Sequence, residues 1–438
     1  MSTRRTTRNA KLASIPLGIA GRAAVGLGKR LAGGDRQQIN EELARKAAEQ
    51  LFSVLGELKG GAMKLGQALS VMEAAIPEEL AQPYREALTK LQADAPPMPT
   101  SSVHRVLDQQ LGLGWRKRFR HFDDAPTASA SIGQVHRAVW SDGRDVAVKV
   151  QYPGADEALR ADLKTLKRMA GLFSTLAPGA DVKAMLTEIS ARTEEELDYR
   201  TEAQNQRTFA KAFAGHDRFV VPKVIASAPK VIVSEWLTGT PLSKIIKEGD
   251  KALRDRAGAL MAEFHFSSPA VAGLLQCDPH PGNYMMLDDN RLGVIDYGAC
   301  APFPEGLPPI LGALVRLVVG ERFDELTQLM YDNGFVLDGH EVSPQEVADY
   351  LRPITDPLRS ETFHFTRKWL QQAAAPGMDF NSKQFKTGRA MNLPSQYVMI
   401  MRVLVGSVGI ACQLDAEAGF RQIMADWLPG FADPVPAT

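Results

Sequence analysis

A block of strand-forming residues between two helical stretches constrains the fold of this chain more than any other feature. Residues 119–152 are rich in phenylalanine, isoleucine and valine, and a Ser-Asp-Gly turn divides them into two runs. Residues 37–93 before this block and 156–215 after it carry apolar side chains at helical spacing. Two more strand-like runs follow, and the remainder is mostly helical. The pattern predicts an α+β fold with a small β-rich lobe and a larger helical lobe.

Proline and charge divide the chain into four expected segments. The prolines at positions 96, 97 and 99 end the first helical stretch, because proline cannot continue a helix. We expect a basic segment at 1–36, a helical extension at 37–100, a β-rich lobe with inserted helices at 101–237 and a helical lobe at 238–438. Two interpretations of the first segment stay open: contact with an anionic membrane surface, or a terminus packed on the body of the protein.

Composition limits the classes of partner and compartment. Lysine plus arginine and aspartate plus glutamate number 51 each, so a nucleic-acid partner is not expected. The three cysteines have neither paired nor metal-type spacing, which favours a reducing compartment. Residues 397–414 are apolar but contain Arg402, which favours a buried helix over a membrane span. We expect a cytoplasmic protein, with peripheral contact at the inner face of the membrane left open.

Carboxylate and amide side chains recur at fixed spacing after residue 270. Asn283 follows Asp278 by five residues, and Asp296 follows thirteen residues later, directly before Tyr297 and a glycine. The first spacing equals that of the catalytic loop of protein kinases, and the second motif differs from the kinase Asp-Phe-Gly only in its tyrosine. Asp278 is therefore the candidate catalytic carboxylate. Asn283 and Asp296 are candidate ligands for Mg²⁺ or Mn²⁺, which prefer hard oxygen atoms. His280 is a candidate donor to the γ-phosphate.

A strand-like run that ends in Lys149 matches the kinase strand whose lysine pairs with ATP phosphates and a helix glutamate. One hairpin upstream, a small-residue segment takes the place of the glycine-rich loop, with alanine at two glycine positions. Small residues let backbone approach phosphate, although alanine restricts φ more than glycine does. A plain hairpin turn is the alternative. The residues expected to cover the nucleotide are Ala128, Ser129, Ala130, Ser131, Ile132, Gly133, Gln134 and Val135.

The end of the last strand-like run of the small lobe is the expected hinge between the lobes. Glu235 and Leu237 flank Trp236 there, just before a Thr-Gly pair. Backbone groups at this position of a kinase meet adenine, so Glu235 and Leu237 are candidate nucleotide contacts. A plain strand end explains the segment equally well in isolation.

Four short motifs, taken in order, resemble the UbiB (AarF) family of atypical kinases. They are the KxGQ motif with Lys64, Gly66 and Gln67, the segment 130–136, the acidic segment 196–203 and the loop 278–283. The KxGQ motif and the ExD motif of Glu196 and Asp198 are hallmarks of that family and are not found in ordinary kinases. The resemblance covers roughly residues 37–415.

The resemblance implies a two-lobed protein-kinase-like fold with a helical amino-terminal extension packed over the active site. It implies that Glu202 is the helix glutamate that pairs with Lys149. Asp198 would lie one helical turn earlier, on the same face, and with Glu196 would lie near the KxGQ segment. That segment would occupy the space where a protein kinase receives its peptide, which disfavours protein phosphorylation in trans.

The function implied by the resemblance is that of an ATP-dependent atypical kinase or ATPase. It would bind MgATP and support isoprenoid quinone biosynthesis of the ubiquinone type, or lipid handling. The implied partners are ATP, lipid or quinone precursors, and proteins of quinone biosynthesis. The alternative is a nucleotide-binding pseudokinase scaffold without turnover, which the alanine-for-glycine loop motivates.

Overall fold

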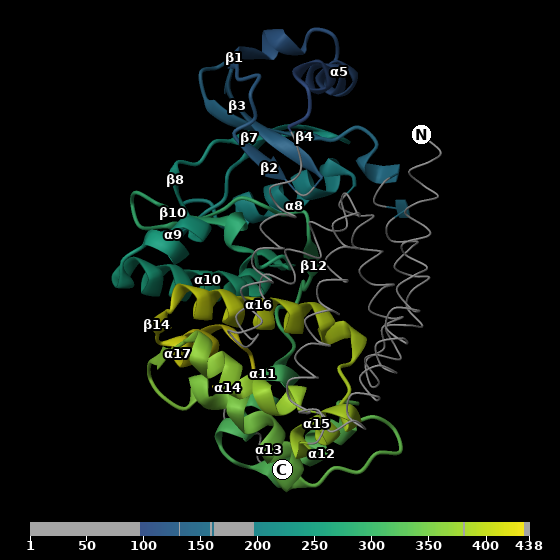
Figure 1. Cartoon of the computed structure of the whole chain (residues 1–438), viewed down its shortest axis with the longest axis vertical. Coiled ribbons are helices and arrows are strands. Elements are labelled where there is room, and N and C mark those ends of the chain that lie inside the picture. The colour runs from purple at the N-terminus through teal and green to yellow at the C-terminus, as the bar shows by residue number, and fades with distance from the viewer. Residues whose placement is uncertain (1–96, 131, 158–159, 162–196, 380–381, 433–438) are drawn as a thin grey trace, which may run out of the picture.

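The computed structural model describes residues 97–130, 132–157, 160–161, 197–379 and 382–432 (Figure 1). A small lobe that contains a β-sheet lies at one end of the molecule, and a larger helical lobe forms the rest. The α+β fold with two lobes is thereby confirmed. Most of the expected extension 37–100 lies outside the described residues.

One antiparallel sheet forms the small lobe, in the order β1-β3-β4-β7-β6, with β2 paired to β3. Valine at alternate positions makes β4 a buried strand, because successive side chains of a strand point to opposite faces. Gly143, in the turn between β3 and β4, has φ of 96°, which glycine adopts at little cost. The strands are β1 (Phe119–Phe122), β2 (Ala128–Ala130), β3 (Gly133–Trp140), β4 (Asp145–Gln151), β6 (Val224–Ala228) and β7 (Val231–Glu235).

Two helices pack against opposite faces of this sheet. Helix α5 (Thr100–Leu111) covers the face that carries Val231 and Val233, and its own buried residues recur at helical spacing. Helix α8 (Tyr199–Ala212) follows the other face, where Ile232 packs with the start of α8. Because neighbouring residues of β7 enter different clusters, both faces of the sheet are covered. A short 3₁₀ turn, η2 (Trp115–Arg118), links α5 to β1.

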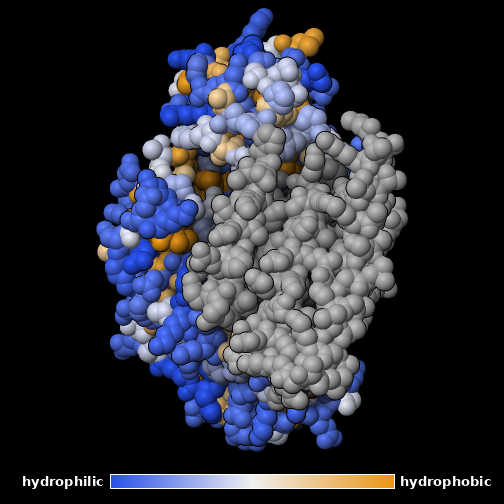
Figure 2. Space-filling model, viewed as in Figure 1, coloured by the Kyte–Doolittle hydropathy of each residue, from blue (hydrophilic) through white to orange (hydrophobic). Residues whose placement is uncertain are grey.

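Helix α10 is the centre of the helical lobe, and α8, α9, α16 and α17 all contact it. Its buried face forms the largest apolar cluster together with residues of α8, α9 and α16. The helices of this lobe are α9 (Leu242–Glu248), α10 (Lys251–Ala272), α11 (Pro309–Val319), α12 (Phe323–Asp332), α13 (Pro344–Thr355), α14 (Arg367–Met378), α15 (Lys383–Ala390), α16 (Val398–Leu414) and α17 (Phe420–Trp427). In Figure 2 the visible surface of this lobe is mostly hydrophilic.

Short strands below the sheet of the small lobe carry the loops with the candidate site residues. A four-stranded sheet has the order β5-β11-β10-β8, and β9 pairs with β12. These strands are β5 (Phe219–Val220), β8 (Gly239–Pro241), β9 (Leu274–Gln276), β10 (Tyr284–Leu287), β11 (Leu292–Val294) and β12 (Cys300–Pro302). The strands β13 (Phe363–His364) and β14 (Glu417–Ala418) and the turns η3 (Pro281–Asn283), η4 (Asp356–Leu358) and η5 (Ser395–Tyr397) complete the lobe.

Among the described residues, one helical stretch, Ser395–Leu414, is long and apolar enough to cross a membrane. Slightly more than half of its most apolar window, 56%, is buried inside the protein. Helix α16 packs on α10 and α14 through this buried face, which agrees with the expected buried helix. Met401, Arg402 and Val405 lie on its exposed side.

Candidate active site

Because successive side chains of β4 point to opposite faces of the sheet, Lys149 points away from the apolar core that lies between the sheet and α5. Val146, Val148 and Val150 are fully buried on one face of the strand, so Lys149 lies on the face that α8 covers. Its Nζ donates a hydrogen bond to Glu202 Oε1 at 2.7 Å and another to Asp296 Oδ2 at 3.1 Å. Lys149 therefore joins the sheet, α8 and the loop after β11 in one ion cluster.

Two carboxylates around the ammonium group decide its charge. Glu202 lies in the first turn of α8, where the helix dipole favours a negative side chain, and it is 4% exposed. Burial alone would lower the pKa of Lys149, but Asp296 and Glu202 together raise that pKa well above its usual value. Lys149 thus carries a full positive charge near pH 7, as a contact to phosphate oxygens requires.

The loop after β9 fixes the carboxylate of Asp278 from two sides. Asn283, in the 3₁₀ turn η3, donates from Nδ2 to the backbone oxygen of Asp278 at 2.9 Å and to its Oδ2 at 3.2 Å. Arg402 Nη2 donates to Asp278 Oδ1 at 3.2 Å. Each carboxylate oxygen of Asp278 therefore has a partner, and a second lone pair on each oxygen still has room for a substrate hydroxyl or water.

The donor set suits a magnesium ion held mainly through the nucleotide. Asn283 directs its amide nitrogen at Asp278, so its Oδ1 is the atom left for a cation. Asp296 contributes a carboxylate, which also accepts from Lys149 and from the backbone of Gly298 at 3.0 Å. In the described part of the chain, no group of three His, Cys, Asp or Glu side chains could hold a metal. One carboxylate and one amide fit Mg²⁺, which commonly binds proteins through one or two side chains plus phosphate oxygens.

Arg402 is a site residue that the kinase motifs do not reveal. It lies on α16, 124 positions after Asp278 in the sequence, and its side chain is 40% exposed whereas that of Asp278 is 16% exposed. The signal in the sequence was a lone arginine inside an apolar stretch. It argued against a membrane span, but periodicity alone does not say which loop a helix faces.

His280 is a neutral side chain in this site. Its Nδ1 accepts a hydrogen bond from the backbone of Gly282 at 3.1 Å, which leaves the ring proton on Nε2. Burial lowers the pKa of His280 below its usual value, despite the opposing charges of Asp278 and Asp296. His280 can therefore donate a hydrogen bond to phosphate but carries no fixed positive charge near pH 7.

The small-residue segment forms a tight hairpin over the sheet. Ala128 pairs with Val135, and Ala130 pairs with Gly133, so β2 and β3 run antiparallel side by side. A Cβ atom at Gly133 would lie 2.3 Å from the backbone oxygen of Val150 and 2.9 Å from the hydroxyl of Tyr199. Glycine is required there because β4 and α8 approach the hairpin closely.

Two of the residues expected to cover the nucleotide, Ile132 and Gln134, point their side chains into the small lobe. Ile132 packs with Tyr199 in the apolar cluster against α8. Gln134 accepts from the backbone of Met98 at 2.7 Å and contacts His136 Nε2 at 2.9 Å. Any contact of Gln134 with nucleotide would therefore come from its backbone. Ser131 lies outside the described residues.

The hinge candidates lie between the two lobes. Glu235 ends β7, and its Oε2 accepts from the backbone of Lys223 at 3.0 Å. Leu237 lies close to Gly293 of β11, because a Cβ atom at Gly293 would be 3.0 Å from the Leu237 side chain. The roles of Glu235 and Leu237 as adenine contacts stay predictions.

The expected common helix face of Asp198 and Glu202 is wrong. Asp198 is the N-cap of α8, with extended backbone, and its Oδ1 accepts from the backbone of Arg200 at 3.0 Å. The carboxylate also pairs with the Arg200 guanidinium, at 2.6 Å from Nη2, so it turns back on the helix end. Capping satisfies a helix-end N–H group, a role for which aspartate is among the preferred residues. Lys64, Gly66, Gln67 and Glu196 lie outside the described residues.

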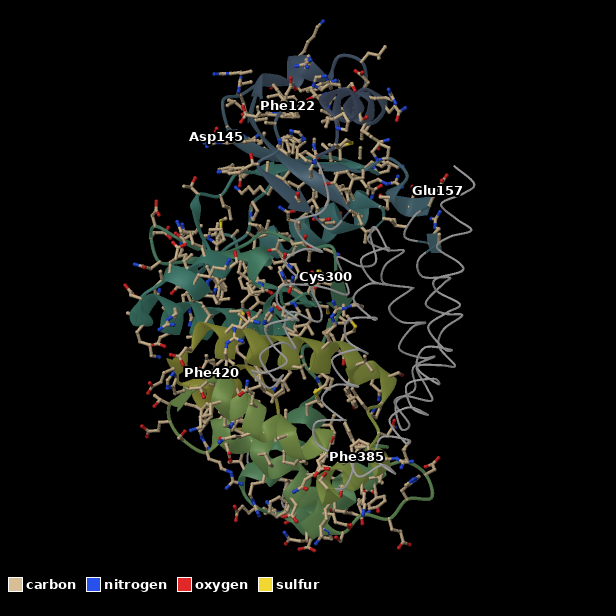
Figure 3. The ribbon with its side chains drawn as sticks, viewed as in Figure 1. Phe122, Asp145, Glu157, Cys300, Phe385 and Phe420 are labelled. Atoms are coloured by element: carbon tan, nitrogen blue, oxygen red, sulfur yellow. The ribbon has the colours of Figure 1, made fainter. Side chains whose placement is uncertain are left out.

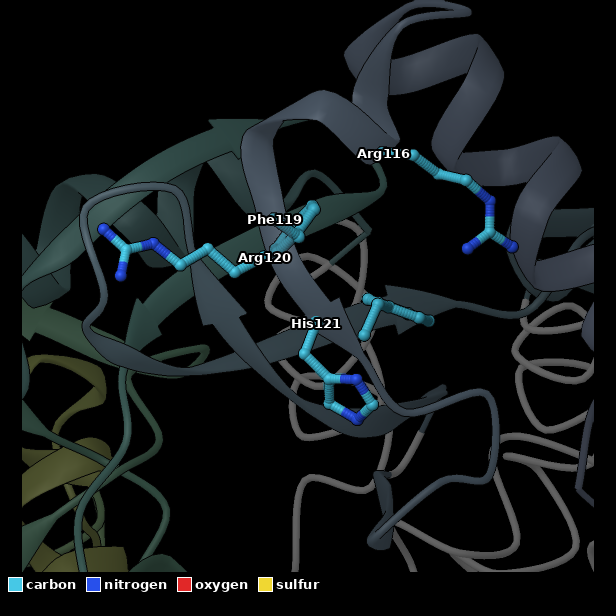
Figure 4. Close-up of a pocket in the computed structure, with 5 residues that line it drawn as sticks. Arg116, Phe119, Arg120 and His121 are labelled. Atoms are coloured by element: carbon cyan, nitrogen blue, oxygen red, sulfur yellow. The ribbon is translucent and has the colours of Figure 1, made fainter.

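Two buried or partly buried cysteines and a surface hollow take no part in the ion cluster around Lys149. Cys300 and Cys277 form no disulfide, and Cys300 lies in the middle of the molecule (Figure 3), where burial raises its pKa well above the usual value. A hollow on the small lobe is lined by Arg116, Phe119, Arg120, His121 and Phe122 (Figure 4). It lies along β1, on the outer edge of the sheet, and not against β4.

Comparison with known proteins identifies the family. The family model described as ABC1 atypical kinase-like domain matches residues 90–319. The mitochondrial atypical kinase coq-8 of Caenorhabditis elegans is 30% identical over 75% of this chain and 43% of that protein. The mitochondrial atypical kinase COQ8B of Danio rerio is 29% identical over 69% of this chain and 49% of that protein. The chain thus spans less than half the length of these two relatives.

A solved structure covers nearly the whole chain. A complex of Rv3197 with erythromycin from Mycobacterium tuberculosis has a TM-score of 0.70 and 54% sequence identity, over 91% of this chain and 100% of that chain. The match of the family model, the relatives and this structure agree with the four motifs found in the sequence. This chain belongs to the ABC1 (UbiB/AarF) family of atypical kinases.

Proposed function

We propose that this chain is an ATP-dependent atypical kinase or ATPase that binds MgATP between its lobes. The observation that carries the proposal is the contact of Lys149 with both Glu202 and Asp296, since it joins three separate elements around one buried cation. A protein without nucleotide chemistry gains little from such a cluster, because a buried ion pair is a weak source of stability. Phosphates and a cation are the natural ligands of this arrangement.

Each residue has a distinct task in this proposal. Lys149 holds phosphate oxygens of ATP, and Glu202 orients Lys149. Asn283 and Asp296 hold Mg²⁺, which neutralises phosphate charge when it is bound. Asp278 accepts a hydrogen bond from the attacking hydroxyl or water and takes its proton as the acceptor oxygen bonds to the γ-phosphorus and the bond to the leaving ADP breaks.

We further propose that the acceptor is water or a small molecule connected with isoprenoid quinone biosynthesis. The likeness to the coq-8 and COQ8B kinases supports this choice of pathway. Lipid or quinone precursors and quinone-biosynthesis proteins are the proposed partners, and phosphorylation of other proteins is disfavoured. The cytoplasmic location, with peripheral contact at the membrane, stays a prediction from the cysteine and charge pattern.

The test is a steady-state ATPase assay of the full chain with Mg²⁺, alone and with phenolic or lipid activators. Wild-type protein should release phosphate, and Asp296→Asn should reduce the rate by about 100-fold or more, because the substitution removes the carboxylate that would hold Mg²⁺ against the phosphates. If wild-type protein hydrolyses ATP no faster than Asp296→Asn does, the proposal that this chain is an enzyme is contradicted.

The same preparation tests the pseudokinase alternative. A scaffold would show equal thermal stabilisation by MgATP and MgADP, with no phosphate release. Phosphotransfer to peptides at rates typical of protein kinases would contradict the proposal that phosphorylation of other proteins is disfavoured.

A further inference from the structure

A chain of buried polar side chains runs from α16 to the backbone of both catalytic motifs. Ser407 Oγ lies 2.8 Å from His265 Nδ1, and His265 Nε2 lies 2.8 Å from the hydroxyl of Tyr284. Tyr284 donates to Gln276 Oε1 at 2.9 Å. All four side chains are buried, with exposures between 0% and 7%. They come from four elements, α16, α10, β10 and β9, that meet only in the folded protein.

Gln276 gives this chain its contact with the site. Its Nε2 donates to the backbone oxygen of Asp278 at 3.1 Å and to that of Asp296 at 3.3 Å. One amide group thus links the loop of the candidate catalytic carboxylate to the loop of the candidate metal ligand. The separation of those two loops depends on where the Gln276 side chain is held.

The direction of the hydrogen bonds among Gln276, Tyr284 and His265 follows from that amide. Because Nε2 of Gln276 faces two carbonyl oxygens, its Oε1 must accept, and the Tyr284 hydroxyl must donate to it. His265 then donates from Nε2 to Tyr284, so its Nδ1 is left as an acceptor that faces the Ser407 hydroxyl. That hydroxyl also lies 2.7 Å from the backbone oxygen of Val403, a second acceptor for its proton. Burial lowers the pKa of His265 to about 4, so the ring is neutral and this single tautomer is held near pH 7.

The surroundings of the chain make it costly unless it is complete. Tyr284 packs among the apolar residues of the largest core cluster, and a buried donor or acceptor left without a partner costs more than a made hydrogen bond contributes. Apolar side chains at these four positions would pack in the core without any buried polar group to leave unpaired. The four hydrogen-bonded side chains end on two catalytic loops. Their presence is therefore better explained by the orientation they give to those loops than by a gain in the stability of the fold.

We propose that Tyr284, His265 and Ser407 are positioning residues that act through Gln276 to hold the Asp278 and Asp296 loops at a fixed separation. The proposal rests on the proposed function only for its kinetic consequence. The positional effect is measurable without turnover.

The first test compares Tyr284→Phe with Tyr397→Phe, a second buried tyrosine that lies outside the chain. Tyr284→Phe should lower kcat for ATP hydrolysis about tenfold and leave KM for ATP within about twofold, because small displacements of reacting groups cost rate more than binding. Tyr397→Phe should leave both constants unchanged. An unchanged kcat in Tyr284→Phe, or an equal loss in both variants, would overturn the proposal.

A double-mutant cycle tests whether the effect passes through Gln276. Gln276→Met keeps the side-chain length and removes its polar atoms. If Tyr284 acts through Gln276, adding Tyr284→Phe to Gln276→Met should change kcat by less than about twofold. If instead the fold-changes in kcat of the two single variants multiply in the double variant, Tyr284 does not act through Gln276, and the proposal is overturned. If Gln276→Met does not fold, Ser407→Ala at the far end of the hydrogen-bonded chain is a milder variant. It should lower kcat as Tyr284→Phe does, whereas Ser407→Thr, which keeps the hydroxyl, should retain the wild-type kcat.

Amide hydrogen exchange separates this proposal from the proposed function. The backbone bonds from Cys277 to Ala299, at 2.8 Å, and from Ile295 to Asn283, at 3.0 Å, report on the two loops. Tyr284→Phe should raise exchange in segments 277–283 and 295–299 more than in α10, and Tyr397→Phe should not. If wild-type protein hydrolyses no ATP, the proposed function fails, yet this exchange pattern still supports the positioning chain. Equal exchange in both variants would sink the positioning chain whatever the activity.

Discussion

At the scale of single residues, the site depends on groups whose charge is set by their neighbours. Lys149 is kept cationic by Asp296 and Glu202, whereas His280 and His265 are kept neutral by burial. The family resemblance predicted that Glu202 pairs with Lys149, and the contact between them confirms it. The contact of Lys149 with Asp296, which was predicted only as a metal ligand, did not follow from the motifs. The protonation states did not follow from the motifs, because they depend on how deeply each group is buried.

The buried ring of His265 makes stability depend on pH. The pKa of this histidine falls from its ordinary 6.5 to about 4 on folding, because burial disfavours the charged ring. Between these values the unfolded chain binds a proton that the folded protein does not, so the free energy of unfolding decreases as pH falls. This ring should contribute about 2 kcal/mol to the loss of stability between pH 7 and pH 5.

Urea unfolding of wild type and His265→Gln at pH 7 and pH 5 checks this expectation. Groups common to both proteins cancel in the comparison, so wild type should lose more stability on acidification than the variant. The ring contacts Tyr284 and Ser407, which stay neutral over this range, so their titration does not enter. Equal pH dependence in both proteins would show that His265 is not buried as a neutral ring.

At the scale of elements, the hairpin of β2 and β3 is fixed by a close approach rather than by flexibility. Gly133→Ala should destabilise the small lobe by about 1–3 kcal/mol, because its Cβ would overlap the backbone oxygen of Val150. The displaced hairpin should also weaken nucleotide binding, seen as a smaller thermal shift with MgATP. Gly114→Ala is the matched control, since a Cβ there has nothing within 4 Å. Equal stability of the two variants would contradict the required approach.

The start of α8 shows what element prediction from the sequence misses. The resemblance to the UbiB (AarF) family correctly placed Glu202 on a helix that faces Lys149. Asp198 was expected on the same helix, yet it caps it. Aspartate is a preferred N-cap residue, but helix periodicity does not say in which turn a helix begins.

At the scale of the whole molecule, the two lobes and the catalytic loops were predictable because they follow the order of motifs along the chain. The groups that support those loops were not. Arg402 and Ser407 come from α16, more than a hundred residues after Asp278, and their contacts depend on how helices pack. Side-chain spacing shows that a helix has a buried face, but the partner of that face is settled by the packing of the whole lobe.

The contact between Arg402 and Asp278 yields a prediction at this scale, since it ties α16 to the site. Arg402→Met should lower kcat for ATP hydrolysis about tenfold, because the carboxylate of Asp278 loses one of the two groups that orient it. The melting temperature should change little, since the pair is partly exposed and such pairs contribute little stability. Steady-state kinetics together with thermal unfolding measure both effects.

Arg359→Met provides the matched control for Arg402→Met. Arg359 pairs with Glu321 at 2.9 Å on the surface of the same lobe, and its side chain is 31% exposed. Both variants remove one partly exposed arginine and its ion pairing, which for Arg359 also includes Asp356 at 3.9 Å. They differ in whether a partner carboxylate belongs to the site. A loss of kcat confined to Arg402→Met would mean that α16 orients the catalytic loop. The same kinetics in both variants would mean that Asp278 is held by Asn283 and its own backbone alone.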